Sequence, residues 1–190
     1  APRAAGSGGP GAALLSVGAL VPRKGHDVLL RALGGLADLE WSLTIAGPEG
    51  RDPVHARGLR ALAEELGIAQ RVRFAGAVDG AALDALYAGA DVFALATHWE
   101  GYGMAVAEAL ARGLPVAVTA GGAVAELVPA EAAVVSPPSD HVSLGKGLRR
   151  LVFDADLRRA MADAAWRAGQ RLPRWEDRAE AFAAEIGKAR

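Results

Sequence analysis

Short apolar segments alternate with amphipathic segments along most of the chain, and this alternation constrains the fold more than any other feature. The apolar segments are residues 13–20, 41–47, 71–76, 91–96, 114–120 and 131–137. Between them, helical spacing of apolar residues marks 26–36, 54–67, 80–90 and 103–113. Apolar strands separated by helices are typical of a parallel sheet that is buried on both faces. The sequence therefore predicts an α/β, doubly wound, Rossmann-like fold.

The two ends of the chain depart from this alternation. Residues 1–12 are rich in glycine, proline, serine and alanine without periodicity, which is typical of a flexible linker. Residues 13–190 are the predicted domain, and it ends in extra helices predicted at 139–153, 155–170 and 174–188. Trp175 and Phe182 lie on one face of the last helix, where core packing is the simpler explanation for both aromatic rings.

Composition limits the chemistry and the partners of the chain. Its 190 residues suit one domain of ordinary size. Because cysteine is absent, disulfides, thiolate metal sites and thiol nucleophiles are excluded. The 21 basic and 22 acidic residues are mixed along the chain and give a net charge of -1, so we expect no nucleic-acid partner. No apolar run is long enough for a transmembrane helix.

The loop after residues 91–96 has the composition of an anion site. Gly101 and Gly103 let backbone N–H groups approach a ligand closely, and the positive end of the following helix points to the same place. Glu100 and Glu108 flank this turn, and carboxylates only accept hydrogen bonds. A nucleoside diphosphate sugar would satisfy both, with phosphates on the amides and hydroxyls on the carboxylates. The alternative is that the glutamates are solvated surface charges.

Two cations follow the first predicted strand. Arg23 and Lys24 precede a helix, where their charges can balance a diphosphate, although a solvated surface pair is the alternative. Ligands of a doubly wound sheet bind at the carboxyl ends of its strands, so we expect loops 18–25, 74–78 and 97–104 to lie there. The glycine spacing in the first loop differs from the dinucleotide fingerprint, which argues against NAD.

Taken together, these motifs resemble the donor nucleotide-binding, C-terminal half of a retaining glycosyltransferase of the GT-B fold, in family 4 (group 1). The resemblance extends from Leu14 to about Arg190, and it depends on the order and spacing of the motifs because each one alone is weak. They are Gly18 through Lys24-Gly25, Glu100-Gly101-Tyr102-Gly103 with Glu108 eight residues after the first glutamate, "EALARGLPVAVT", and Gly121-Gly122 with Glu126.

The resemblance also implies roles for individual residues. Lys24, helped by Arg23, would bind the donor diphosphate, Glu108 the ribose hydroxyls, and Glu100 the transferred sugar. Lys24, Arg23 and Glu100 are thus the expected catalytic residues. Loop 74–78 would hold the base through backbone groups. The remaining implied donor contacts are Gly18, Phe74, Gly76, Val78, Thr97, Gly101, Tyr102, Gly103, Met104, Gly121 and Gly122.

Several of these positions have a second explanation. Many relatives carry an arginine after the first glycine, where this chain has Ala19, and we expect Arg23 to replace it. Thr97 either binds a phosphate or caps its turn, and Glu126 is expected to cap or pair locally. His98 could reach the sugar, but solvation is the expected state of a loop histidine. No zinc site is expected from the remaining histidines, which lack ligand spacing: His26, His55 and His141. Gly121-Gly122 could also form a plain turn.

The resemblance implies an enzyme that transfers a hexose from a UDP, GDP or ADP sugar to an unknown acceptor with retention of configuration. It implies no metal or other cofactor, because the cations take the place of a metal. The N-terminal acceptor domain would be absent, so the chain alone is expected to be inactive. A cytoplasmic location is expected, with contact to a membrane surface through the absent half left open. A non-catalytic binding or interaction module and half of a UDP-sugar epimerase are the alternatives.

Overall fold

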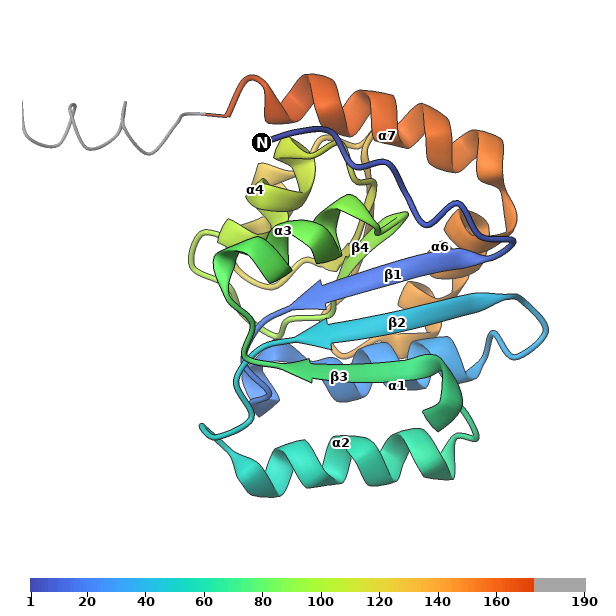
Figure 1. The fold of residues 1–190 in the computed structure, drawn as a ribbon, viewed down its shortest axis with the longest axis vertical. Coiled ribbons are helices and arrows are strands. Elements are labelled where there is room, and N and C mark those ends of the chain that lie inside the picture. The colour runs from blue at the N-terminus through green and yellow to red at the C-terminus, as the bar shows by residue number, and fades with distance from the viewer. Residues whose placement is uncertain (173–190) are drawn as a thin grey trace, which may run out of the picture.

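Six parallel strands form one sheet in the order β3-β2-β1-β4-β5-β6 in the computed structural model, which describes residues 1–172 (Figure 1). The strands are β1 (Ala12–Val17), β2 (Trp41–Ala46), β3 (Val72–Gly76), β4 (Val92–Leu95), β5 (Val116–Thr119) and β6 (Ala133–Ser136). Because β1 pairs with both β2 and β4, the chain reverses its direction across the sheet between these two neighbours. The predicted doubly wound α/β fold is confirmed.

Helices cover both faces of this sheet. The longer ones are α1 (His26–Gly34), α2 (Pro53–Glu65), α3 (Gly80–Ala88), α4 (Met104–Ala111), α6 (His141–Phe153) and α7 (Ala155–Gly169). Three short helical turns were not predicted from the sequence, namely η1 (Pro22–Lys24), η2 (Ala69–Arg71) and α5 (Val124–Leu127). The two extra helices predicted at 139–153 and 155–170 correspond to α6 and α7. The third, at 174–188 with Trp175 and Phe182, lies outside the described residues.

Aspartates set the starts of four helices by capping. Each carboxylate accepts a hydrogen bond from the backbone N–H three residues later, which satisfies a donor that the first turn leaves free. The four caps are Asp52, Asp79, Asp140 and Asp154. Gly67 and Gly113, at φ of 69° and 72°, follow α2 and α4, where glycine takes the left-handed conformation at little cost. These local signals explain why the helix boundaries could be read closely from the sequence.

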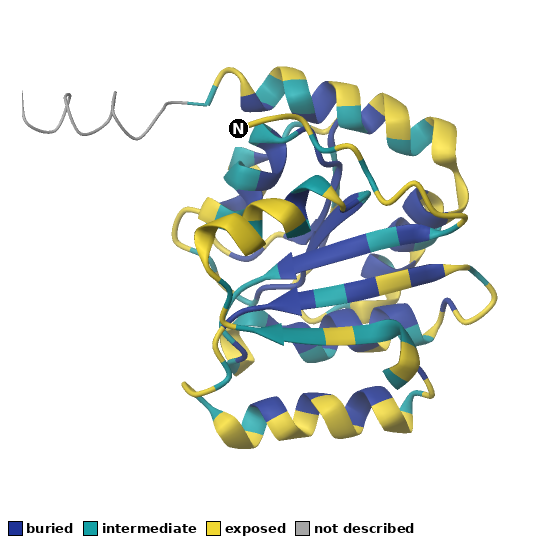
Figure 2. Ribbon diagram, in the orientation of Figure 1, coloured by how far each residue is buried: buried dark blue, intermediate teal, exposed yellow. Residues whose placement is uncertain are grey.

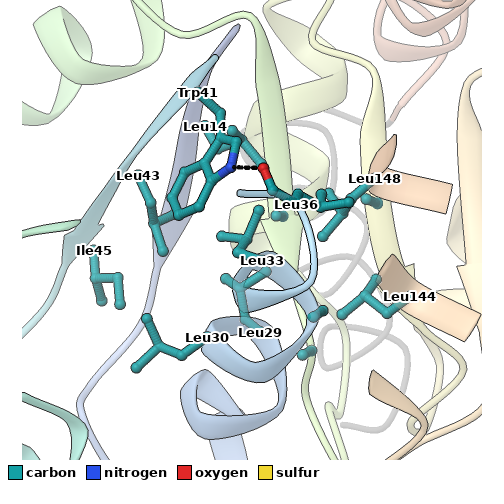
Figure 3. Packing of buried hydrophobic residues seen from close by; sticks show 14 of the residues in the cluster. Leu14, Leu29, Leu30, Leu33, Leu36, Trp41, Leu43, Ile45, Leu144 and Leu148 are labelled. Atoms are coloured by element: carbon teal, nitrogen blue, oxygen red, sulfur yellow. Dashed lines mark hydrogen bonds between the residues drawn. The ribbon is translucent and has the colours of Figure 1, made fainter. Parts of the chain in front are cut away.

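Alternate residues of the strands divide between two cores. Leu14 packs with α1, α2 and α6 on one face of the sheet, and Leu15 packs with α3, α4 and α7 on the other. Figure 2 shows the central strands as almost entirely buried. In the first core, shown in Figure 3, the Trp41 indole donates a hydrogen bond to the Leu36 carbonyl at 2.9 Å. Two buried faces explain why β4 and β5 are buried at every residue, without the alternation of a half-exposed strand.

The N-terminal segment, predicted to be a flexible linker, makes contacts with the body of the fold. Its backbone N–H groups bond to the body of the fold: that of Ala4 to the Arg112 carbonyl at 2.8 Å, and that of Ala5 to the Ala88 carbonyl at 2.9 Å. The Ser7 hydroxyl donates to Asp91 at 2.6 Å. Strand β1 moreover begins at Ala12, inside the range assigned to the linker. Residues 4–7 are therefore held at the C-terminal ends of α3 and α4, and their role as a connection to another domain stays a prediction.

Candidate functional site

The loop after β1 and the loop after β4 meet at the carboxyl ends of these two neighbouring strands. The His98 backbone N–H donates to the Arg23 carbonyl at 2.9 Å. The Arg23 guanidinium in turn donates to the Trp99 carbonyl at 2.7 Å. The expected meeting of loops 18–25 and 97–104 is thus observed, at the point where the strand order reverses. In folds of this kind, that point is where ligands bind.

Gly25 is the residue that permits this close approach. It has a φ of 62°, and a Cβ atom built on it would lie 1.9 Å from the Ala96 carbonyl oxygen at the end of β4. No side chain fits at that distance, so only glycine allows η1 and the start of α1 to sit against β4. The glycine in the motif Lys24-Gly25 is explained by packing between loops, before any ligand is considered.

The three predicted catalytic residues lie together in this region. Lys24 Nζ is 2.5 Å from Glu100 Oε2, and the Arg23 guanidinium is 3.7 Å from the same oxygen. The Lys24 and Glu100 side chains are 14% and 16% exposed, whereas that of Arg23 is 47% exposed. Two cations therefore share one carboxylate, and the group carries a net positive charge. Such a group can attract an anion from solvent.

The backbone of Glu100 is fixed by the segment that follows β5. Its N–H donates to the Gly121 carbonyl at 3.0 Å, and its carbonyl accepts from the Ala123 N–H at 3.0 Å. A Cβ atom on Gly122 would lie 2.2 Å from the Glu100 carbonyl oxygen, and one on Gly121 would lie 2.6 Å from that of Thr97. Both glycines are explained by this contact between loops. It matches the turn that we left open as the alternative to donor contact.

Thr97 is buried and serves the loop itself. Its hydroxyl lies 3.1 Å from the Arg23 carbonyl and 3.0 Å from the Trp99 carbonyl, and it can donate to either. Its own carbonyl accepts a hydrogen bond from the Thr119 hydroxyl at 2.5 Å. The Thr97 hydroxyl is therefore already engaged with backbone, which favours the capping role over a phosphate contact. Thr119 was not among the predicted site residues.

The turn before α4 has the open geometry expected of an anion site. Gly103 is the N-cap residue of α4 with a φ of 86°, and its carbonyl accepts from the Ala107 N–H as the first helical bond forms. Gly101, Tyr102 and Met104 around it are exposed. Because the first amides of a helix have no partner inside the helix, they remain available to a ligand here. Trp99, 59% exposed, adds an aromatic surface that the sequence prediction missed.

Glu108 lies on α4, half-buried and facing α3. The hydroxyl of Tyr87, at the end of α3, donates to the Ala105 carbonyl at 3.1 Å, one turn before Glu108. Burial raises the pKa of the Tyr87 phenol, the negative charge of Glu108 and a hydrogen bond to it raise that pKa further, and the Arg112 charge acts in the opposite direction. Tyr87 therefore stays protonated and is a permanent donor beside Glu108. It was not predicted as a site residue.

The residues predicted to hold the base lie at the end of β3, beside β2. Phe74 is in β3 and not in the loop, and its ring packs under the Arg60 guanidinium at 4.4 Å. The Gly76 carbonyl accepts from the Gly47 N–H at 2.8 Å, so this carbonyl is occupied within the sheet. Val78 is half-buried in the loop that follows.

In the loop after β1, Gly18 leaves room for the Lys24 side chain. A Cβ atom on Gly18 would come within 3.1 Å of that side chain.

The histidines near the site do not form a metal centre. His26 is fully buried, with Nε2 3.4 Å from the Gly18 carbonyl oxygen, and burial lowers its pKa to about 4. Its Nδ1 has no partner within the described part of the chain. His98 Nδ1 is 3.1 Å from the Ser139 hydroxyl. Residues 1–172 contain no cluster of three or more histidine, aspartate or glutamate side chains suited to a metal ion.

None of the helices in residues 1–172 is both long and apolar enough to span a bilayer.

Comparison with known proteins places this geometry in a family. A family model described as glycosyl transferases group 1 matches residues 3–167. A D-inositol 3-phosphate glycosyltransferase of Thermomonospora curvata is 34% identical over 167 residues, which are 84% of this chain and 39% of that protein. A similar enzyme of Salinispora tropica is 36% identical over 80% of the chain and 33% of its own length. The chain thus spans between one third and two fifths of the length of these two curated relatives.

Solved structures agree with the fold. Sucrose-phosphate synthase from Thermosynechococcus elongatus superposes with a TM-score of 0.81 at 26% identity, covering 95% of this chain and 45% of that one. The Anabaena protein HepE, in complex with UDP and glucose, gives a TM-score of 0.80 at 23% identity over 91% of this chain and 48% of its own. In both comparisons the matched region is slightly under half of the other chain. From the fold, the loop motifs and the family match, the chain belongs to the group 1 glycosyl transferases.

Proposed function

We propose that this chain binds the nucleotide-sugar donor of a retaining hexosyltransferase. The observation that carries the proposal is the pairing of Lys24 and Arg23 with Glu100 beside the open start of α4. Cations and free helix amides suit the diphosphate, while the carboxylates suit hydroxyl groups. The Anabaena relative of the same fold was solved with UDP and glucose, which makes UDP the first nucleotide to test.

In this proposal each group of the donor meets one part of the site. The diphosphate lies against Lys24, Arg23 and the amides at the start of α4. Glu108 accepts hydrogen bonds from the ribose hydroxyls, and Glu100 accepts from the hexose. When the bond between the sugar and the diphosphate breaks, negative charge grows on the leaving phosphate. Lys24, Arg23 and the start of α4 stabilise that charge electrostatically, which is how such a site lowers a barrier.

The same cations support a reaction without a metal. A metal ion in such enzymes would neutralise the leaving diphosphate, and two basic side chains with a helix start can do this instead. Donor binding is therefore expected to be the same with and without a chelator.

The curated relatives are more than twice as long as this chain, so we assign acceptor binding to a further domain and expect no transfer by this chain alone. The cytoplasmic location and any contact with a membrane surface stay predictions.

A non-catalytic module of the same fold is the main competing proposal. It would need a nucleotide or partner surface but no sugar contact, and the partly buried Glu100 between two cations is difficult to explain in that case. Half of a UDP-sugar epimerase would need an acid and a base that act on the sugar. We can place neither group among the residues that the structure describes. Product analysis of a full-length protein separates epimerisation from transfer.

Calorimetric titration with UDP, GDP, ADP and their glucose and mannose conjugates tests the proposal. We expect one nucleotide to bind, and we expect Glu108→Ala to weaken that nucleotide about tenfold, because hydrogen bonds to a charged acceptor are lost. Glu64→Ala is the matched control, since Glu64 is an exposed glutamate on α2. Absence of binding by all three nucleotides, or equal losses in both variants, would contradict the proposal.

A further inference from the structure

Trp99 is a large aromatic residue that lies open to solvent at the edge of the proposed donor site. It belongs to the loop between β4 and α4, directly before Glu100, and it is 59% exposed. Single exposed aromatic residues are common and need no explanation by themselves. This one adjoins two groups that we assign to the donor, the Glu100 carboxylate and the amides at the start of α4. Its position, more than its exposure, therefore points to contact with a ligand.

The main chain at Trp99 is fixed from two sides. Its carbonyl accepts a hydrogen bond from the Arg23 guanidinium at 2.7 Å. The N–H of the same peptide unit, which belongs to Glu100, donates to the Gly121 carbonyl at 3.0 Å. Both bonds involve backbone atoms of this loop, so they do not depend on the indole. A substitution of the Trp99 side chain should therefore leave the loop in place.

The indole ring packs against the turn that follows it. A Cβ atom built on Gly101 would lie 3.4 Å from Trp99 Cη2 and 3.7 Å from Cζ3, which is ordinary van der Waals contact. The six-membered part of the indole thus lies next to the Gly101 backbone, while more than half of the residue faces solvent. An apolar ring surface beside a few fixed polar groups is the usual composition of a small-molecule site.

The order of the strands indicates which part of the donor lies beside this ring. Loop 74–78, expected to hold the base, is at the end of β3, whereas Lys24 follows β1 and Trp99 follows β4. In the order β3-β2-β1-β4, the ends of β3 and β4 are three strand spacings apart, roughly 14 Å. The proposed diphosphate contact at Lys24 lies between them. A donor that extends along this edge therefore brings its hexose, and not its base, to Trp99.

A hexose in its pyranose form matches both surfaces at this end of the site. One face of the sugar ring carries mainly C–H groups, and hydroxyl groups project from its rim. The C–H face can pack on an indole, while a carboxylate such as Glu100 accepts hydrogen bonds from the rim.

We propose that Trp99 is a specificity-determining residue for the donor, whose indole packs against the apolar face of the hexose. This inference rests on the proposed function, because a nucleotide sugar must bind here for Trp99 to matter. Removing the indole should weaken recognition of the sugar and leave recognition of the nucleotide unchanged.

The test compares one nucleotide with and without its sugar. The nucleoside diphosphate that binds most tightly among UDP, GDP and ADP is titrated by calorimetry, and so are its glucose and mannose conjugates. The dissociation constant of the diphosphate, divided by that of the tighter conjugate, reports the contribution of the hexose. We expect Trp99→Ala to lower this ratio about fivefold, the size of one aromatic contact, and to change the affinity for the diphosphate less than about twofold. Trp99→Phe should keep most of the ratio, because it retains an aromatic ring.

Phe153→Ala is the matched control. Phe153 is a 78% exposed aromatic residue at the C-terminal end of α6, whereas the loop before the N-terminal end of α6 contacts the site loop through Ser139 and His98. This variant should keep both the ratio and the affinity of the original chain.

The outcomes separate this inference from the proposed function. The inference is wrong, and the nucleotide site stands, if Trp99→Ala keeps the ratio or weakens the diphosphate and its conjugate equally. The same conclusion follows if the hexose adds no affinity in the original chain. If none of the three diphosphates binds, the proposed function fails and the inference fails with it.

Discussion

Lys24 Nζ lies 2.5 Å from Glu100 Oε2, although 76 residues separate the two in the sequence. The residue proposed to bind phosphate and the residue proposed to bind sugar thus neutralise each other across two loops when no donor is bound. Both side chains are mostly buried, so the attraction is weakened less by water and salt than at an open surface. A diphosphate that binds here must compete with Glu100 for Lys24.

This competition makes Glu100→Gln informative. A neutral amide cannot hold Lys24 as strongly, so we expect a nucleoside diphosphate without sugar to bind about three- to tenfold more tightly to the variant at low salt. The gain should shrink as ionic strength rises. For the complete nucleotide sugar the gain should disappear, because the hexose loses its charged acceptor. Calorimetry with both ligands at two salt concentrations measures this, and equal affinity of the variant and the original chain for the diphosphate would refute the competition.

Arg23 provides the second cation of the site. We expect Arg23→Ala to weaken nucleoside diphosphate binding at least threefold, because it removes a charge 3.7 Å from the Glu100 carboxylate. Arg57→Ala is the matched control, since Arg57 is an exposed arginine on α2. Arg23 also donates to the Trp99 carbonyl, so the melting temperature of the variant must be compared as well. Normal binding by a stable Arg23→Ala chain would end the idea that Arg23 compensates for Ala19.

The strands and most helices could be predicted because their signals are local. Strands buried on both faces are apolar throughout, as in β4, and helices such as α3 start at an aspartate cap that is visible in the sequence. The end of the sheet that carries the site follows from the fold class. These features depend on neighbours in the sequence or on rules that hold for every fold of this kind.

The details of the site could not be predicted because they depend on contacts between distant segments. Nothing near Thr97 in the sequence shows that its hydroxyl will donate a hydrogen bond to the Arg23 carbonyl oxygen. Gly121-Gly122 has the composition of a ligand-binding turn, and only the paired backbone of Glu100 shows that it supports another loop. The glycine-rich N-terminus likewise has the composition of a linker, yet Ala4 and Ala5 find backbone acceptors on the body of the fold.

Two glycines with similar backbone angles separate conformational strain from steric clash. Gly67 and Gly25 have φ of 69° and 62°, but a Cβ atom on Gly67 meets nothing within 4 Å, and one on Gly25 lies 1.9 Å from the Ala96 carbonyl oxygen. We expect Gly67→Ala to lower the free energy of unfolding by about 1 kcal/mol, the cost of a left-handed alanine. Gly25→Ala should cost several times more and should also reduce donor binding. Urea unfolding of both variants checks this, and similar losses would contradict the explanation of Gly25 by contact with β4.

His26 should make the fold sensitive to acid. Burial lowers its pKa from 6.5 to about 4, so the unfolded chain binds a proton at a higher pH than the folded chain does. Between these values the unfolded state carries more protons, and stability therefore falls as the pH falls. His26 alone should reduce the free energy of unfolding by about 2 kcal/mol between pH 7 and pH 5.

Urea unfolding at pH 7, 6 and 5 measures the contribution of His26 as a slope and not as an absolute stability. In His26→Gln the buried side chain no longer titrates, so whatever the absolute stability of the variant, its loss between pH 7 and pH 5 becomes about 2 kcal/mol smaller. His141→Gln is the matched control, because His141 is exposed at the start of α6. It should keep the original slope. An unchanged slope in His26→Gln would show that this imidazole gains a proton without cost in the folded chain, and its buried Nδ1 would then need a partner that stabilises the charge.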